Sequence, residues 1–188
     1  MDKDFTLEIY KSERTVFKLR DIAMLTGARN ADNLKALVNY YVSKGVIKSV
    51  RKGLYVKDSY SMEELACRVY SPSYVSLETA LSKAGVIFQY SSAVTAVSYL
   101  TRTIAVDGVE IVYRKIKDTV LVEDTGIERE GNVNVAIPER AFLDRLYLSK
   151  NYHFDNIRPL DRDVVEDLLE IYQCAALTKR ARRIFQNA

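Results

Sequence analysis

One continuous stretch, residues 16–56, restricts the fold of this chain more than any other. It holds two runs of apolar residues at helical spacing, separated by Gly27, and then two short β-rich runs around Gly53. Glycine readily adopts the left-handed conformation that ends a helix and turns the chain sharply. Two helices joined by a tight turn and followed by a β-hairpin are typical of a winged helix-turn-helix, whose second helix fits the DNA major groove. The stretch therefore predicts this fold.

The second helix of the stretch is predicted to begin at Asn30, a good N-cap residue, and to stop at Gly45. Its apolar residues recur three and four positions apart and form one buried stripe: Leu34, Leu37, Val38, Tyr41 and Val42. A wheel at about 100° per residue places another set on the opposite side: Asp32, Asn33, Ala36, Asn39, Tyr40 and Ser43. This outward face is polar but carries little charge.

Asparagine and arginine are the side chains that pair with the edges of adenine and guanine, and a small residue such as Ala36 allows close approach to the bases. We expect Asn33 and Asn39 to read bases and Arg29 to read a base or a phosphate. The candidate DNA-contacting residues of this helix and the turn before it are Arg29, Asn30, Asn33, Lys35 and Asn39. The alternative is an ordinary solvated helix face.

After Gly45 the pattern changes to a hairpin, with the runs VIKSV and LYVKD on either side of the turn RKG. Three cations gather at or near its tip: Lys48, Arg51 and Lys52. Long cationic side chains there would reach phosphates or a minor groove beside the helix. We therefore add these residues to the candidate DNA-contacting set.

Charge is distributed unevenly along the chain, although the net charge is only +3. Up to Lys57 there are 12 basic and 6 acidic residues, and beyond it there are 16 and 19. A positive excess confined to the smaller N-terminal part fits a phosphate-facing module beside a neutral or acidic domain. A solvated basic surface would give the same count. We expect residues 1–57 to form the DNA-binding domain and residues 58–188 a second domain.

Cysteine and histidine usage argues against a metal site. Cys67 and Cys174 are far apart with no CxxC pair, and His153 is the single histidine of the 188 residues. The charged, amphipathic start does not resemble a signal peptide, and no run of residues approaches the length of a membrane span. We expect a reduced, cytoplasmic protein without a metal, cofactor or membrane partner.

The pattern beyond residue 57 predicts an α+β domain with a mostly antiparallel sheet and a helical tail. Helices are expected at residues 61–70, 74–85, 138–150, 161–172 and 175–185. Strands are expected at residues 93–100, 103–106, 109–116, 119–123 and 133–137. The dipeptide Asp107-Gly108 between two of these strands is a strong hairpin signal.

No motif of the chain predicts catalysis. The glycine spacing from Gly126 to Gly131 resembles a phosphate-binding loop, but Asn132 and Val133 stand where lysine and a hydroxyl residue are required. The triplet beginning at Asp124 is similar to that of aspartic proteases, yet charged neighbours indicate an exposed turn. His153 has no nucleophile suggested beside it. We therefore expect a protein that is not an enzyme.

The C-terminal tail carries a cluster of cations with two interpretations. Its members are Lys179, Arg180, Arg182 and Arg183. They would contact nucleic acid or an acidic protein surface, or they would complement the dipole at the end of a helix. We prefer the second interpretation.

The order of these motifs resembles that of the AbiEi antitoxin family, over about residues 17–172. The resemblance is carried by KGLY at residues 52–55, SLETAL at 76–81 and AIPERA at 136–141. It implies an N-terminal winged helix-turn-helix that binds operator repeats in the protein's own promoter and represses it. It also implies a C-terminal antitoxin domain that counters an AbiEii-like nucleotidyltransferase toxin.

Two other functions are compatible with the sequence. The winged helix would serve only as a scaffold for binding another protein, or the chain would be an orphan regulator without a toxin. A hydrolase with an unrecognised site is the weakest alternative, since it needs an acid and a base clustered in a pocket. The operator sequence, the toxin and the oligomeric state stay open, because repeated half-sites are filled by a dimer or by successive monomers.

Overall fold

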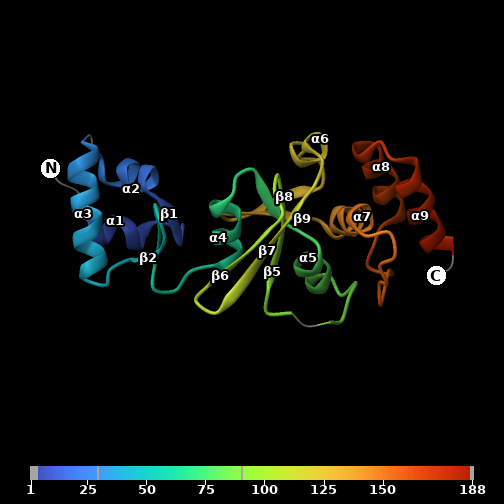
Figure 1. Ribbon diagram of the computed structural model, residues 1–188, viewed down its shortest axis with the longest axis horizontal. Coiled ribbons are helices and arrows are strands. Elements are labelled where there is room, and N and C mark those ends of the chain that lie inside the picture. Colours follow the sequence, from blue (N-terminus) through green and yellow to red (C-terminus); the bar gives the residue numbers. More distant parts are fainter. Residues whose placement is uncertain (1–3, 29, 90, 187–188) are drawn as a thin grey trace. The chain divides into compact units, whose positions relative to one another are not determined.

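The computed structural model describes residues 4–28, 30–89 and 91–186, which form a mixed α+β fold (Figure 1). The chain divides into two compact units, Met1–Val69 and Tyr70–Ala188. The expected boundary after residue 57 precedes the observed boundary after Val69 by a single helix, α4 (Met62–Val69). The N-terminal unit contains α1 (Phe5–Lys11), β1 (Val16–Lys18), α2 (Leu19–Thr26), α3 (Ala31–Ser43), β2 (Lys48–Arg51), β3 (Leu54–Val56) and α4 (Met62–Val69).

Helices α1, α2 and α3 enclose a small apolar core in the N-terminal unit (Figure 1). Phe5 of α1 stacks on Tyr41 of α3 with ring centroids 4.0 Å apart. α2 ends at Gly27, which has φ +70° in the left-handed region, and the chain turns into α3 within a few residues. The three strands form an antiparallel sheet in the order β1-β3-β2.

Helix α4 belongs to the N-terminal unit because its carboxylate Glu64 holds the start of β1. Glu64 is 2% exposed. Its oxygens accept hydrogen bonds from the backbone N–H of Thr15 at 2.9 Å, the Thr15 hydroxyl at 2.6 Å and the N–H of Val16 at 3.3 Å. Arg68 of the same helix pairs with buried Asp21 at 2.7 Å. Contacts from the buried Glu64 and the half-buried Arg68 hold α4 against β1 and α2.

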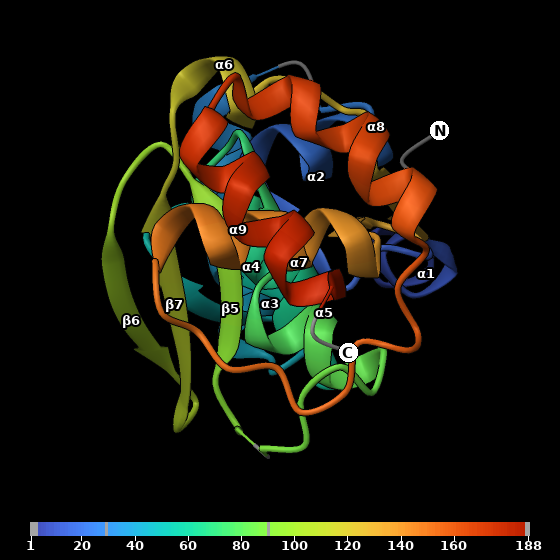
Figure 2. The ribbon, with the colours of Figure 1, turned by 90° about the vertical axis from the view of Figure 1, so that its right-hand side faces the viewer.

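The C-terminal unit holds a six-stranded sheet and helices. Its elements are β4 (Ser73–Val75), α5 (Glu78–Lys83), β5 (Val94–Ser98), β6 (Arg102–Val106), β7 (Val109–Lys115), α6 (Asp118–Leu121), β8 (Ile127–Glu130), β9 (Val133–Ala136), α7 (Pro138–Leu148), α8 (Arg162–Tyr172) and α9 (Ala175–Gln186). The strand order is β6-β7-β5-β4-β9-β8. Figure 2 shows β6 at the edge of the sheet and α7, α8 and α9 beside one another.

The sheet is mixed, which refines the expectation of a mostly antiparallel one. Strand β4 runs parallel to β9, and β5 runs parallel to β7. The other three pairings, β4–β5, β6–β7 and β8–β9, are antiparallel. The hairpin at Asp107-Gly108 forms as predicted, because residues there adopt positive φ angles of 49° and 79° between β6 and β7.

Two local predictions for this unit are wrong, and one strand is missed. Tyr74 and Val75, expected in a helix, form β4 because they pair with β5 on one side and β9 on the other. Residues 119–123, expected as a strand, form none: residues 119–121 lie in α6, where Val120 and Leu121 are buried, and the helix ends before Val122. The strand Ile127–Glu130, which pairs with β9, was not expected. In each case contacts distant in sequence override the local pattern.

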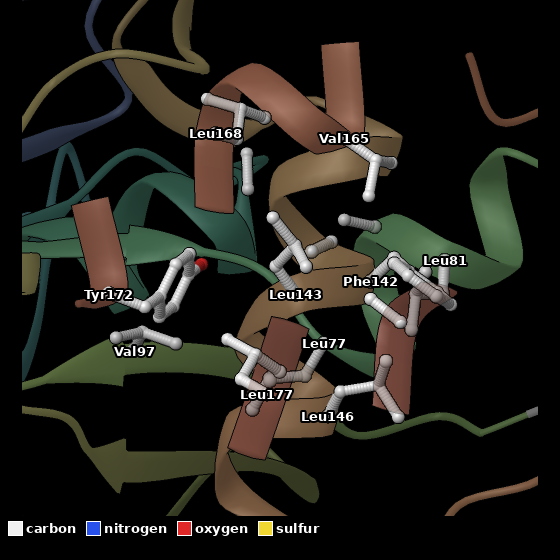
Figure 3. Close-up of a cluster of buried hydrophobic side chains, with 14 of the residues drawn as sticks. Leu77, Leu81, Val97, Phe142, Leu143, Leu146, Val165, Leu168, Tyr172 and Leu177 are labelled. Carbon is white, nitrogen blue, oxygen red and sulfur yellow. The ribbon is translucent and has the colours of Figure 1, made fainter. Parts of the chain in front are cut away.

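Helix α7 is the central helix of the C-terminal core, since it contacts α5, α8, α9 and β9. Figure 3 shows Phe142, Leu143 and Leu146 of α7 among apolar side chains from neighbouring elements. The neighbours labelled there are Leu77, Leu81, Val97, Val165, Leu168, Tyr172 and Leu177. Burial of these side chains stabilises the unit by removing apolar surface from water.

A buried ion pair lies on the inner face of α7. Arg140 and Asp144 are both fully buried, with 3.6 Å between Arg140 Nε and Asp144 Oδ1. The guanidinium also donates to two backbone carbonyls, that of Thr125 at 2.8 Å and that of Val120 at 2.7 Å. It thereby ties α6 and the loop before β8 to α7.

Three hydroxyl groups surround the partner carboxylate of this pair. Asp144 accepts hydrogen bonds from Tyr172 at 2.7 Å, Ser76 at 2.8 Å and Tyr74 at 3.2 Å. Burial raises the pKa of Asp144, and Arg140 with these hydroxyls opposes the rise. Burial and the nearby carboxylate raise the pKa of Tyr74 and of Tyr172 well above the usual value, so both hydroxyls stay protonated and donate. The network links β4, α7 and α8.

Replacing Arg140 by methionine would leave Asp144 buried with no positive charge beside it. We expect Arg140→Met to lower the free energy of unfolding by about 3–5 kcal/mol, measured by urea denaturation at pH 7. The double variant Arg140→Met/Asp144→Asn should recover part of this decrease, because a neutral amide keeps an acceptor oxygen for the hydroxyls. A decrease below about 0.5 kcal/mol in the single variant would contradict this role of the ion pair.

Gly126 provides a second test, because a side chain there would press on the same network. Its φ is +78°, and a Cβ would lie 3.1 Å from Arg140 Cβ and 3.2 Å from Leu168 Cδ2. Gly131 is the matched control, since its φ is also positive, +60°, but nothing lies within 4 Å of a Cβ built there. Gly126→Ala should cost about 1–3 kcal/mol more than Gly131→Ala in the same denaturation experiment. Equal costs would show that the close packing at Gly126 is without effect.

Candidate functional site

The exposed face of α3 carries the side chains that the helical wheel placed there. Asn33, Ala36, Asn39 and Ser43 are exposed, and so is Tyr40, at 54%. On the opposite side, Leu34 and Val38 are 4% and 0% exposed. The helix therefore presents two carboxamides, a hydroxyl, a methyl group and a phenol ring to solvent.

The start of α3 places the other helix candidates. Asn30 is the N-cap, and its side-chain oxygen accepts from the N–H groups of Asp32 at 2.9 Å and Asn33 at 3.2 Å. That oxygen is therefore used for capping. Lys35 is exposed and pairs with Asp32 at 3.7 Å. Arg29 lies outside the described residues.

Tyr40 has more defined surroundings than an isolated surface ring. It contacts Tyr41 edge-on, with centroids 5.2 Å apart, and Lys44 Nζ lies 5.6 Å from its ring centroid. Tyr41 is itself stacked on Phe5, so this pair extends the core packing to the surface. Lys44 is a cation of this face that is absent from the predicted set. Its place four residues after Tyr40, one helical turn along, was the available signal.

The hairpin of β2 and β3 brings the remaining candidates together. Arg51 and Leu54 face each other across the turn formed by Lys52 and Gly53, and Gly53 has φ +78°. Arg51 and Lys52 are both exposed at this tip. A residue with a left-handed backbone is required in such a tight turn, which explains the glycine in the RKG sequence.

Lys48 lies at the other end of β2, away from the tip. It pairs with Val56 in the sheet, and its Nζ lies 2.5 Å from an Asp58 oxygen. The hydrogen bond from Lys48 holds the pKa of Asp58 below its usual value. Asp58 is absent from the predicted set. Hairpin register could have identified Asp58, because Lys48 lies opposite Val56 and Asp58 follows Val56 by two residues.

A pocket of about 710 Å³ opens beside the turn between α2 and α3. Its apolar wall comes from Phe5, Leu34, Leu37 and Tyr41. The exposed Asn33 of α3 also lines the pocket. The candidate base-reading surface therefore adjoins a hollow in the same unit.

The residues in and beside the motifs considered for catalysis make local contacts within the C-terminal unit. The Thr125 carbonyl accepts from Arg140, and Glu123 accepts from the Thr125 hydroxyl at 2.7 Å. The side chain of His153 is 89% exposed and lies 3.9 Å from Asp155. Within residues 4–28, 30–89 and 91–186, no group of three histidine, cysteine or acidic residues is placed to hold a metal ion.

The cations of the tail are partly engaged within the unit. Arg182 forms a bidentate pair with Glu166, with a shortest distance of 2.8 Å. Arg180 donates to the backbone carbonyl of Leu146 at 3.0 Å. Lys179 and Arg183 are exposed. Two of the four cations therefore contribute to packing α9 against α7 and α8.

Comparison with known proteins adds no identification. No family model matches the chain, and no curated protein matches it. In the part of the chain that the structure describes, no helix is long and apolar enough to cross a membrane.

Proposed function

We propose that this protein is a sequence-specific DNA-binding transcriptional autorepressor. The observation that carries the proposal is the exposed, polar face of α3, followed in the same unit by a hairpin with cations at its tip. The order of α2, the turn at Gly27 and α3 is compatible with a helix-turn-helix, and β2 with β3 would be its wing. The N-terminal unit would then be a winged helix-turn-helix.

The dimensions of α3 suit a DNA groove. Its 13 residues give a helix about 20 Å long, and the major groove is wide enough to admit an α-helix. Asn33 and Asn39 would contact base edges, and Arg29 before the helix would contact a base or phosphate. Asn30 and Lys35, near the start of the helix, would lie beside the sugar–phosphate backbone of the DNA.

The hairpin would supply contacts to the sugar–phosphate backbone. Arg51 and Lys52 at the tip, with Lys48 farther along β2, would neutralise phosphates next to the groove that holds α3. The positive excess of residues 1–57, with 12 basic and 6 acidic side chains, supports this assignment. In this role Asp58 would compete with phosphate for Lys48, since a carboxylate and a phosphate attract the same cation.

For the C-terminal unit we propose the antitoxin role, directed at an AbiEii-like nucleotidyltransferase. The support is the resemblance of the motifs at residues 52–55, 76–81 and 136–141. Within the last two, Ser76 and Arg140 belong to the buried network around Asp144, so these motifs account for the fold of the unit.

The rival proposal is a protein-binding module or an orphan regulator. A scaffold that binds only proteins would have no salt-dependent affinity for DNA, whereas a repressor loses affinity steeply as salt rises. An orphan regulator would bind DNA without any effect on a toxin.

Removing the cations of the hairpin tip tests the DNA-binding role. We expect Arg51→Ala/Lys52→Ala to weaken binding to the DNA upstream of the protein's own coding sequence, measured by fluorescence anisotropy from 50 to 300 mM salt. The slope of log affinity against log salt should become shallower by about 0.9 for each phosphate that the variant no longer neutralises. Arg102→Ala, an exposed cation of β6 in the C-terminal unit, is the matched control and should leave the slope unchanged. An unchanged slope in the double variant would contradict the wing assignment.

Co-expression tests the antitoxin role separately. We expect growth arrest by an AbiEii-like nucleotidyltransferase encoded beside this gene to be relieved when this chain is expressed with it. The variant Arg51→Ala/Lys52→Ala should relieve the arrest equally, because the antitoxin role is assigned to the C-terminal unit. Continued arrest with well-expressed wild-type chain would refute the antitoxin role and leave DNA binding untouched.

A further inference from the structure

We infer that α3 recognises A·T base pairs at the centre of its DNA half-site. This inference rests on the proposed function and names the base pairs that the helix would read. It follows from the chemistry of the side chains that the described part of α3 exposes and from their spacing.

The two exposed carboxamides favour adenine. An asparagine side chain has an amide donor and a carbonyl acceptor side by side, which match N7 and the N6 amino group of adenine in the major groove. Asn33 and Asn39 are both exposed on α3. At about 100° per residue they lie about 60° to either side of Ala36, and about 9 Å apart along the axis. This separation corresponds to roughly three base pairs at about 3.4 Å each.

The apolar side chains of the same face favour thymine. The C5-methyl group of thymine is the apolar group of the major groove, and small or aromatic side chains contact it. Ala36 lies between the two asparagines, and Tyr40 follows one turn later. The Tyr40 ring lies edge-on to Tyr41 and near Lys44, and it is 54% exposed, so it presents apolar surface to solvent.

The two lysines described on this helix lie to the side of Ala36 or at the C-cap, and not in the middle of the face. Lys35 lies about 100° around the helix from Ala36 and pairs with Asp32 of the first turn, and Lys44 lies against Tyr40 at the C-cap of the helix. Asp32, the acidic side chain that would accept from cytosine, is held in that first pair. Arg29 precedes α3 and lies outside the described residues. A G·C preference would therefore arise at the borders of the half-site, with A·T pairs between them.

Selection from a random duplex library by the full chain tests the base preference. The enriched half-sites should share two or more A·T pairs at their centre. In such a duplex, 7-deazaadenine removes the N7 acceptor of adenine, and deoxyuridine removes the methyl group of thymine. Each replacement should weaken binding by wild-type protein by about tenfold.

Matched variants assign the two effects to residues. Asn33→Ala/Asn39→Ala should lose sensitivity to 7-deazaadenine and keep sensitivity to deoxyuridine. Tyr40→Ser should lose part of the sensitivity to deoxyuridine, since Ala36 remains, and should keep sensitivity to 7-deazaadenine. Ser43→Ala is the control on the same face and should keep both. Because these positions are exposed, thermal unfolding should show that the variants stay folded.

The outcomes separate this inference from the proposed function. No salt-dependent binding to any duplex by the folded wild-type chain would overturn both. Two results would overturn only the A·T inference. One is tight binding to selected sites with G·C pairs at the centre, and the other is tight binding that neither base replacement weakens.

Discussion

Burial of one apolar stripe on α3 determines what the N-terminal unit shows to solvent. Leu34 and Val38 are buried in the core with Ile22 and Ile47, and Tyr41 is stacked on Phe5. These contacts fix the orientation of α3 about its own axis, because any other orientation would expose the apolar stripe and bury carboxamides without partners. The identity of the candidate base-reading residues depends on this constraint.

The N-terminal unit is completed by α4, a helix that the sequence predicts but that was expected in the second domain. Through Glu64 and Arg68, α4 supplies charged partners to the backbone at Thr15 and to Asp21. Both side chains find their partners within the unit, which makes α4 part of its structure. The chain thus leaves the unit after a helix and not directly after the hairpin.

Much of the N-terminal unit could be predicted from sequence, because its signals are local. Gly27 ends α2, Asn30 caps α3 and Gly53 allows the hairpin turn, and each acts within a few residues. The exposed set on α3 follows from helical periodicity. The partners Asp58 and Lys44 were missed, since single ion pairs and ring contacts leave little trace in a pattern.

The C-terminal unit was less predictable because its structure depends on long-range pairing. Tyr74 forms a strand only because β5 and β9 flank it, and Val120 lies in a helix too short to show periodicity. β8 consists mostly of exposed charged residues and lacks the alternation by which strands are recognised. Arg140 appeared as part of a family-like motif, and its role in the buried network became visible only in three dimensions.

The most direct test of the account is an NMR titration of the isotope-labelled full chain with a duplex taken from upstream of its own coding sequence. The account predicts that amide shifts change most at the exposed positions of α3 and at the turn between β2 and β3. Little change is predicted at the buried stripe of α3 or in α8. Shifts confined to the C-terminal unit, or no shifts at any duplex concentration at low salt, would contradict it.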